Sequence, residues 1–140
     1  MNVTRILLPV DGSRLSDAAA DMAIDIAASF GASIVLLHVR KPVPSGLGQP
    51  NADELLQYLI KNAEAVMAHY RGKLGNAKVD YLDLIIGGEV AEVIANVAEV
   101  EKCELIVMGS RGRSDLAGLI LGSVTHKVLN ISACPVLVVK

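Results

Sequence analysis

The sequence contains no tryptophan, one phenylalanine and three tyrosines, so aromatic rings are scarce. Proteins that bind single-stranded nucleic acid stack the bases on exposed aromatic rings, and this chain offers few of them. The formal net charge of −2 at pH 7 also supplies no general attraction toward nucleic acid or an anionic membrane. We therefore expect neither nucleic acid nor a membrane as a partner.

Long apolar runs are missing as well. Runs such as residues 34–37 and 136–139 are far shorter than the roughly 20 residues that a membrane-spanning helix needs. The chain begins almost directly with a strand-like segment at residues 5–10, without the pattern of a signal peptide. These features lead us to expect a cytoplasmic protein.

Cysteine is rare, and its spacing excludes the common cysteine-based sites. Cys103 and Cys134 lie far apart, with no CxxC pair and no histidine at metal-binding spacing. We expect both thiols to serve as small core residues rather than as redox groups or metal ligands.

The residues that are abundant are aliphatic. Hydrophobic residues make up 52% of the 140 positions and charged residues 20%, a composition that folds rather than staying disordered. The length fits a single domain over residues 1–140. Aliphatic, alanine-rich chains suit buried parallel strands and closely packed helices.

Strand-like apolar runs alternate with helix-length periodic segments, which indicates a parallel sheet with helices on both faces. Strands are expected over residues 5–10, 33–39, 79–86, 105–108 and 136–139. Helices are expected over residues 16–30, 53–74, 90–100 and 123–131. The buried stripe of the longest helix is expected at Leu56, Leu59, Ile60, Ala63, Val66, Met67 and Tyr70.

The predicted fold class is α/β, with an open, doubly wound, Rossmann-like sheet of five parallel strands. We expect the strand order 3-2-1-4-5, counting strands along the chain. In such sheets ligands bind beyond the carboxyl ends of the strands, where the direction of winding reverses. That point lies between the first and fourth strands, where the chain presents Asp11 and Gly109.

One glycine-rich stretch carries the chemistry. Gly109-Ser110-Arg111-Gly112 is followed by nine residues and then by Gly122-Ser123-Val124-Thr125. The glycines let the backbone turn and a ligand approach closely, and a helix beginning after Gly122 would direct free N–H groups toward a phosphate. Ser123 is expected to cap that helix and to offer a hydroxyl, with further contributions from Thr125, Arg111 and Arg113.

Spacing alone leaves two interpretations of this stretch open. The loop either binds phosphate or is an ordinary connection whose apolar residues pack. Neither a Walker A sequence nor the dinucleotide fingerprint GxGxxG after the first strand occurs.

The pattern Gly-x2-Gly-x9-Gly-Ser resembles the ATP-binding signature of the universal stress protein family. The resemblance extends along the whole chain in the expected order, at residues 6–13, 36–39, 107–112, 121–125 and 133–139. It implies a dimeric, nucleotide-binding α/β protein.

The resemblance also implies roles for individual residues. Asp11 and Pro9 would lie at the adenosine end, and the backbone of Val39 would face the adenine edge. The full expected ATP site is Pro9, Asp11, Val39, Gly109, Ser110, Arg111, Gly112, Arg113, Ser114, Gly122, Ser123, Val124 and Thr125. Asp11 has a simpler alternative as a cap of the turn into the first helix. His38 is expected to be a packed, hydrogen-bonded residue.

Three functions remain in view. The leading one is an ATP-binding regulatory or stress-response protein, since no catalytic base or Walker B partner is evident. The second is a slow ATPase or a phosphoryl or adenylyl transferase, with Mg²⁺ held through the ATP phosphates rather than by protein ligands. The third is a dimeric interaction module that acts on an unidentified regulatory partner without nucleotide.

The last strand predicts self-association. Val136, Leu137, Val138 and Val139 are apolar and β-prone, and the expected strand order places them at a sheet edge. An exposed apolar edge is usually covered or paired, so we expect a homodimer through this strand. The alternative is an edge that is merely hydrated.

Overall fold

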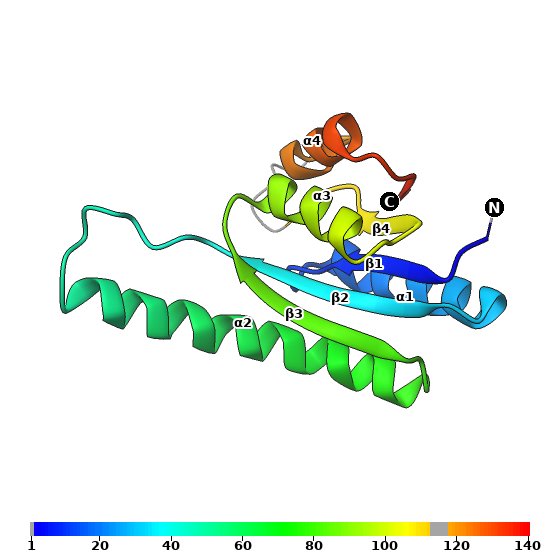
Figure 1. Ribbon diagram of the computed structural model, residues 1–140, viewed down its shortest axis with the longest axis horizontal. Coiled ribbons are helices and arrows are strands. Elements are labelled where there is room, and N and C mark those ends of the chain that lie inside the picture. The colour runs from blue at the N-terminus through cyan, green and yellow to red at the C-terminus, as the bar shows by residue number, and fades with distance from the viewer. Residues whose placement is uncertain (1, 113–117) are drawn as a thin grey trace.

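Five parallel strands form one sheet in the order β3-β2-β1-β4-β5, as the sequence predicted. The computed structural model describes residues 2–112 and 118–140, and Figure 1 shows their arrangement. The strands are β1 (Arg5–Pro9), β2 (Ser33–Arg40), β3 (Tyr81–Gly87), β4 (Leu105–Gly109) and β5 (Val136–Val139). The reversal of winding therefore falls between β1 and β4.

Four helices connect these strands: α1 (Arg14–Phe30), α2 (Asn51–Asn76), α3 (Val90–Val100) and α4 (Ser123–Ile131). Helix α1 begins two residues before its predicted start, because Ser13 is the N-cap and accepts a hydrogen bond from the Ser16 N–H. It ends at Gly31, whose φ of 69° is a left-handed conformation that glycine adopts without steric cost.

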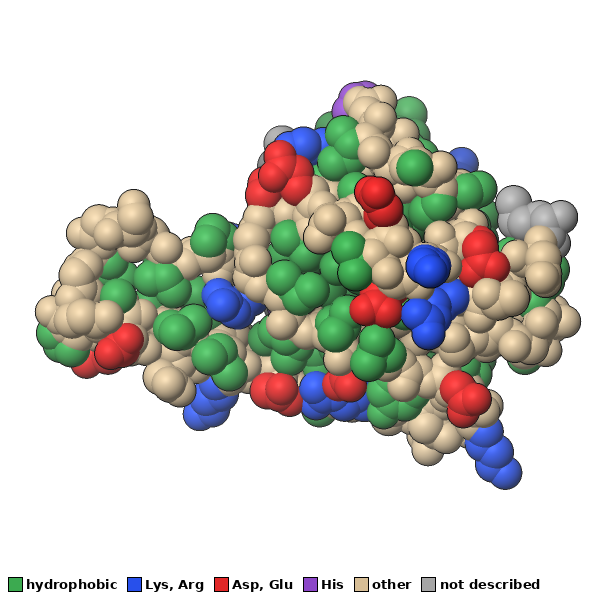
Figure 2. Space-filling model, viewed as in Figure 1, with side chains coloured by type: hydrophobic (Ala, Val, Ile, Leu, Met, Phe, Trp, Pro, Cys, Tyr) green, Lys and Arg blue, Asp and Glu red, His purple; other side chains and the backbone are tan. Residues whose placement is uncertain are grey.

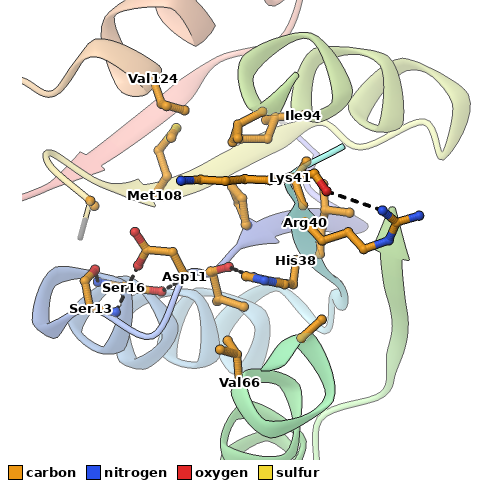
Figure 3. A pocket seen from close by; sticks show the side chains of 18 of the residues that line it. Asp11, Ser13, Ser16, His38, Arg40, Lys41, Val66, Ile94, Met108 and Val124 are labelled. Atoms are coloured by element: carbon orange, nitrogen blue, oxygen red, sulfur yellow. Dashed lines mark hydrogen bonds between the residues drawn. The ribbon is translucent and has the colours of Figure 1, made fainter. Parts of the chain in front are cut away.

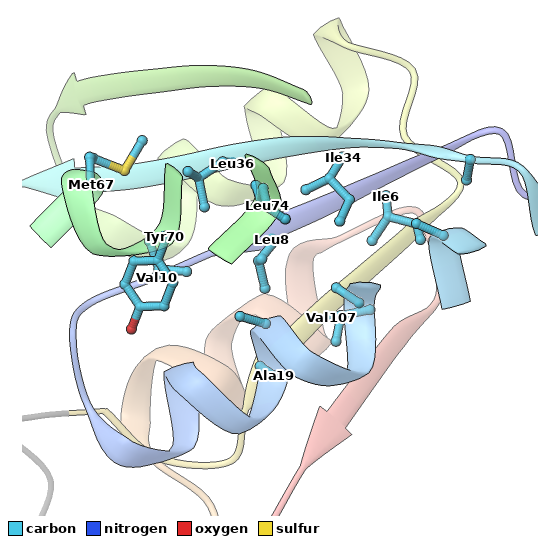
Figure 4. Close-up of a cluster of buried hydrophobic side chains, with 14 of the residues drawn as sticks. Ile6, Leu8, Val10, Ala19, Ile34, Leu36, Met67, Tyr70, Leu74 and Val107 are labelled. Atoms are coloured by element: carbon cyan, nitrogen blue, oxygen red, sulfur yellow. The ribbon is translucent and has the colours of Figure 1, made fainter. Parts of the chain in front are cut away.

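Two apolar layers enclose the sheet. Ile6 and Leu8 of β1 pack with α1 and α2 on one face, in the cluster drawn in Figure 4. Leu7, on the opposite face of the same strand, belongs to the layer under α3 and α4. This alternation follows from the two-residue period of a β-strand, and it buries the three central residues of β1 completely.

Helix α2 is longer than its contact with the sheet. Its N-terminal part extends past the sheet together with the connection from β2 (Figure 1), and hydrophobic side chains show on this projection in Figure 2. Ala63, Met67 and Tyr70 are buried as predicted, whereas Ile60 is 39% exposed. The predicted stripe was therefore wrong at Ile60.

Strand β5 lies at one edge of the sheet and pairs with β4 through Ile106–Gly109. Leu137 in its middle is 36% exposed. The thiol of Cys103 is buried in the layer under α3 and α4, as expected for a core residue, and Cys134 packs beside that layer. Within the described ranges, no helix combines the length and apolar character needed to cross a membrane.

Candidate functional site

A cavity of about 500 Å³ opens at the carboxyl ends of β1 and β4, where the winding of the sheet reverses. We call it the main cavity, and Figure 3 shows it from close by. The predicted site residues that line it are Pro9, Asp11, Val39, Gly109, Arg111, Gly112, Val124 and Thr125. The tertiary structure thus brings together residues from both halves of the chain.

Three of the predicted residues are not part of the lining. Ser110 and Gly122 are buried, and the Gly122 N–H donates a 2.6 Å hydrogen bond to the Ser110 carbonyl oxygen. That bond joins the residue after β4 to the residue before α4. The side chain of Ser123, the third of these residues, is exposed. Arg113 and Ser114 lie outside the described residues.

The first turn of α4 differs in detail from the prediction. Gly122 occupies the N-cap position and Ser123 is the first helical residue, so the prediction that Ser123 caps the helix was wrong. The Thr125 hydroxyl donates to the carbonyl oxygen of Gly109 at 2.9 Å, which commits its only proton. The hydroxyl is thus used within the protein. The Thr125 backbone N–H lies in the first turn of α4, where N–H groups have no intrahelical acceptor.

Gly109 is a glycine for a reason that does not involve a ligand. A Cβ built on it would lie 2.9 Å from the Leu15 Cβ and 3.0 Å from the Leu15 carbonyl carbon in α1. The first separation is shorter than real Cβ atoms show and the second is tighter than most, so the first glycine of the signature permits α1 to pack against β4.

Asp11 stabilises the turn before α1 and also borders the main cavity. Its Oδ1 accepts a 2.9 Å hydrogen bond from the Ser13 N–H, and its own N–H donates to the Ser16 hydroxyl at 3.1 Å. Asp11 thereby holds the turn that leads into α1, although Ser13 and not Asp11 is the N-cap. The carboxylate also lines the main cavity (Figure 3).

A hydrogen-bond network beside Asp11 connects the start of α1 to Tyr70 of α2. The buried Tyr70 hydroxyl lies 2.6 Å from Asp17 Oδ1 and 3.0 Å from Ser16 Oγ. A hydroxyl has one proton, and the carboxylate is the stronger acceptor, so Tyr70 donates to Asp17 and accepts from Ser16. Burial, together with the Asp17 carboxylate, raises the pKa of Tyr70, which keeps the phenol protonated.

Sequence reasoning missed the apolar walls of the cavity. They are supplied by Val10, Leu37, Leu59, Ala63, Val66, Ile94 and Met108. Leu59, Ala63 and Val66 fall within the predicted stripe of α2, but no local signal shows that part of this stripe faces a cavity. His38 also lines it and makes a 2.7 Å hydrogen bond through Nδ1 to the Val10 carbonyl oxygen, as expected for a packed histidine.

The charge on the lining favours an anion. Arg40, Lys41 and Arg111 contribute three cations, and Asp11 is the sole carboxylate among the lining residues that the structure describes. A largely apolar cavity with cations at its rim concentrates anionic ligands. Over residues 2–112 and 118–140, no group of three or more histidine, cysteine, aspartate or glutamate side chains is arranged to bind a metal ion.

The open parallel sheet, with a cavity where its winding reverses, places this chain in the class of small doubly wound α/β domains. Proteins of this class bind ligands beyond the carboxyl ends of their strands. The model of the universal stress protein family matches residues 2–140. The chain therefore belongs to the universal stress protein family.

Individual relatives match over nearly their whole length. A universal stress protein of Thermus aquaticus, encoded in the QAH/OAS sulfhydrylase 3′ region, is 39% identical over 135 residues, covering 96% of this chain and 97% of the relative. Universal stress protein YxiE of Bacillus subtilis is 33% identical, covering 97% of this chain and 98% of its own.

Solved structures agree with the fold. The structure of MJ0577 of Methanocaldococcus jannaschii superposes with a TM-score of 0.91 at 31% identity, covering 100% of this chain and 97% of that one. A universal stress protein in complex with cAMP superposes with a TM-score of 0.76 at 26% identity, covering 100% and 99%.

Proposed function

We propose that this protein binds ATP in the main cavity and acts as a regulatory, stress-response protein. The observation that carries the proposal is the position of Val124 and Thr125, the second and third residues of α4, on the same cavity as the apolar walls. A phosphate at the positive end of α4 and a base between aliphatic side chains would satisfy both parts of the cavity.

The base would lie against Val39, with Ile94 and Met108 as apolar walls. The backbone of Val39 would pair with the adenine edge, while Asp11 would lie at the adenosine end. The cAMP complex of a family member supports an adenine nucleotide as the ligand class. We extend this to ATP because the chain has the glycine signature of the ATP-binding members.

We propose no fast chemistry at this site. Asp11, the one described carboxylate on the lining, is already held by the Ser13 N–H. Mg²⁺ would be held through the ATP phosphates. A slow ATPase or transferase using the same cavity is the second candidate, and a turnover assay that detects ADP or transferred phosphate separates the two.

The proposal includes a homodimer through β5, in the cytoplasm, where ATP is available. An unidentified regulatory protein would then respond to the nucleotide state of the dimer. An interaction module that needs no nucleotide is the alternative. Mass spectrometry of small molecules released from the purified protein distinguishes them, because a module that needs no nucleotide would release none, whereas an ATP-binding protein would release ATP or its hydrolysis products.

Calorimetric titration with Val124→Glu tests the phosphate site. The new carboxylate would lie at the positive end of α4, where it favours the helix but repels a phosphate. We expect ATP affinity to fall by about tenfold or more, and a melting curve establishes that the variant is folded, since Val124 packs beside the layer under α3 and α4. Leu129→Glu adds the same charge on the exposed side of the same helix and should leave ATP binding unchanged.

The same titration tests the base. GTP should compete weakly against ATP, because the edge of guanine reverses the donors and acceptors that adenine presents. Unaltered ATP affinity in a folded Val124→Glu protein would remove the phosphate assignment, and equal competition by GTP would remove the adenine assignment.

A further inference from the structure

A second, smaller cavity adjoins the main one. It measures about 160 Å³ and is lined by Ser13, Arg14, Leu15, Arg111 and Gly112. Ser13, Arg111 and Gly112 also line the main cavity, so the two spaces meet along these residues. We call the smaller space the arginine pocket. Its volume is below the roughly 300 Å³ of a typical ligand site, which suits a single small group rather than a second nucleoside.

The two arginines of this pocket form no ion pair with any residue that the structure describes. Among the described residues, neither Arg14 nor Arg111 forms a salt bridge, and the pocket lining contains no acidic side chain. Other arginines are paired, since Arg5 contacts Glu101 and Arg71 contacts both Glu64 and Asp83. The pocket thus concentrates two guanidinium groups that have no described protein counter-charge.

Arg14 occupies a position that does not favour the fold. It is the first residue of α1, where the helix dipole is positive and a cation is unfavourable. Its side chain is exposed and makes no described contact that would compensate. An anion in the pocket would reverse the sign of this interaction, because guanidinium groups bind phosphate oxygens in a bidentate manner.

We propose that the arginine pocket binds the terminal phosphate of a nucleoside triphosphate whose base occupies the main cavity. The phosphate chain would run past Gly112, which borders both spaces, and end between Arg14 and Arg111. The protein would then select triphosphates over monophosphates. This inference rests on the proposed nucleotide function and adds the residues that distinguish ATP from AMP.

Parallel titrations with ATP and AMP test the proposal on the wild-type protein and two variants. Arg14→Ala should weaken ATP binding by about tenfold, the effect of losing one charged hydrogen-bonding partner, and change AMP binding by less than about twofold. Arg14→Lys keeps the charge but not the bidentate geometry, so ATP affinity should lie between the two. Lys61→Ala removes an exposed charge that lies on neither lining and should affect neither nucleotide.

A melting curve accompanies each variant. The unliganded Arg14→Ala protein should melt no lower than the wild type, since a cation is lost from the positive end of α1. Equal weakening of ATP and AMP, or no weakening of either, would overturn the inference while leaving nucleotide binding intact. A wild-type protein that binds neither nucleotide would remove the proposed function and the inference together. Arg14→Lys keeps the test decisive if Arg14→Ala unfolds.

Discussion

Single residues of the glycine signature serve different physical purposes in this protein. Gly109 lies under Leu15 of α1, where no Cβ fits. Gly122 is the N-cap of α4 and closes the loop through its N–H. Gly112 borders both cavities. Gly109 and Gly122 thus serve the packing and the turn, whereas Gly112 lies where the proposed ligand would pass.

Gly109→Ala tests the packing role. The added methyl group would force α1 away from β4, so we expect the free energy of unfolding to fall by about 1–3 kcal/mol. Urea denaturation measures this change. Gly46→Ala is the matched control because a Cβ there meets nothing within 4 Å, and it should be nearly neutral. Equal stability of the two variants would contradict the packing explanation.

The buried thiol of Cys103 should make the free energy of unfolding fall at alkaline pH. Burial raises the pKa of its thiol from 9.0 to about 12. Below pH 9 the thiol is neutral in both states and its contribution is complete. As pH rises from 9 toward 12, the unfolded chain loses the proton while the folded chain retains it, so stability falls.

Urea denaturation at pH 7 and pH 10 measures this effect. The wild-type protein should lose about 1 kcal/mol more than Cys103→Ala between the two values. The comparison is made within each protein, so the packing change caused by the smaller side chain cancels. An identical pH dependence in both proteins would show that Cys103 does not titrate differently on folding.

Among the elements, α2 has two parts with different surroundings. Its C-terminal part packs on the sheet through Met67, Tyr70 and Leu74, all fully buried. Leu59 and Val66 lie on the wall of the main cavity. The N-terminal part projects past the sheet (Figure 1), where Tyr58 is 62% exposed. A ligand in the cavity would thus contact the helix where it leaves the core.

Tyr70→Phe should loosen the junction of α2 with α1. The variant keeps the ring but removes the hydroxyl that bonds Asp17 and Ser16, and we expect a loss of about 1–2 kcal/mol of unfolding free energy. Thermal or urea denaturation measures it. Tyr58→Phe removes an exposed hydroxyl and should change stability very little. A Tyr70→Phe protein as stable as Tyr58→Phe would show that the network contributes nothing net.

At the scale of the whole molecule, β3 and β5 form the two edges of the sheet, and each carries an exposed leucine. The β3 edge carries Leu82, which is 45% exposed, and the β5 edge carries Leu137, which is 36% exposed. Each edge presents unpaired backbone groups that another strand could bind. We propose that β5 is the edge used for the homodimer, in line with the family resemblance.

Light scattering at micromolar concentration tests the dimer. The wild-type protein should show about twice the chain mass of 14.7 kDa. Leu137→Lys places a charge at the most exposed position of β5, on the proposed interface, and should shift the mass toward the monomer. Leu82→Lys makes the matched change on the other edge and should leave the dimer intact. A monomeric wild-type protein, or dissociation by Leu82→Lys alone, would refute pairing through β5.

The sequence by itself determined the order and type of the elements. The helical spacing of apolar residues and the position of glycines predicted α3 at Val90–Val100 and α4 at Ser123–Ile131, and the structure has both helices at these bounds. These signals are local, because helix period, strand alternation and turn chemistry depend on neighbouring residues. The signature also identified the cavity edge, since carboxyl ends of adjacent parallel strands meet at one place.

Only the tertiary structure decided what each site residue does. Thr125 donates to Gly109, and Leu15 excludes a side chain at Gly109, through contacts between segments far apart in the sequence. Arg14 and Arg111 likewise line one pocket because the fold brings distant segments together. Such contacts depend on how α1, β4 and α4 pack together. No local pattern encodes them, because the energy of a packed contact belongs to both partners and exists only once the chain has folded.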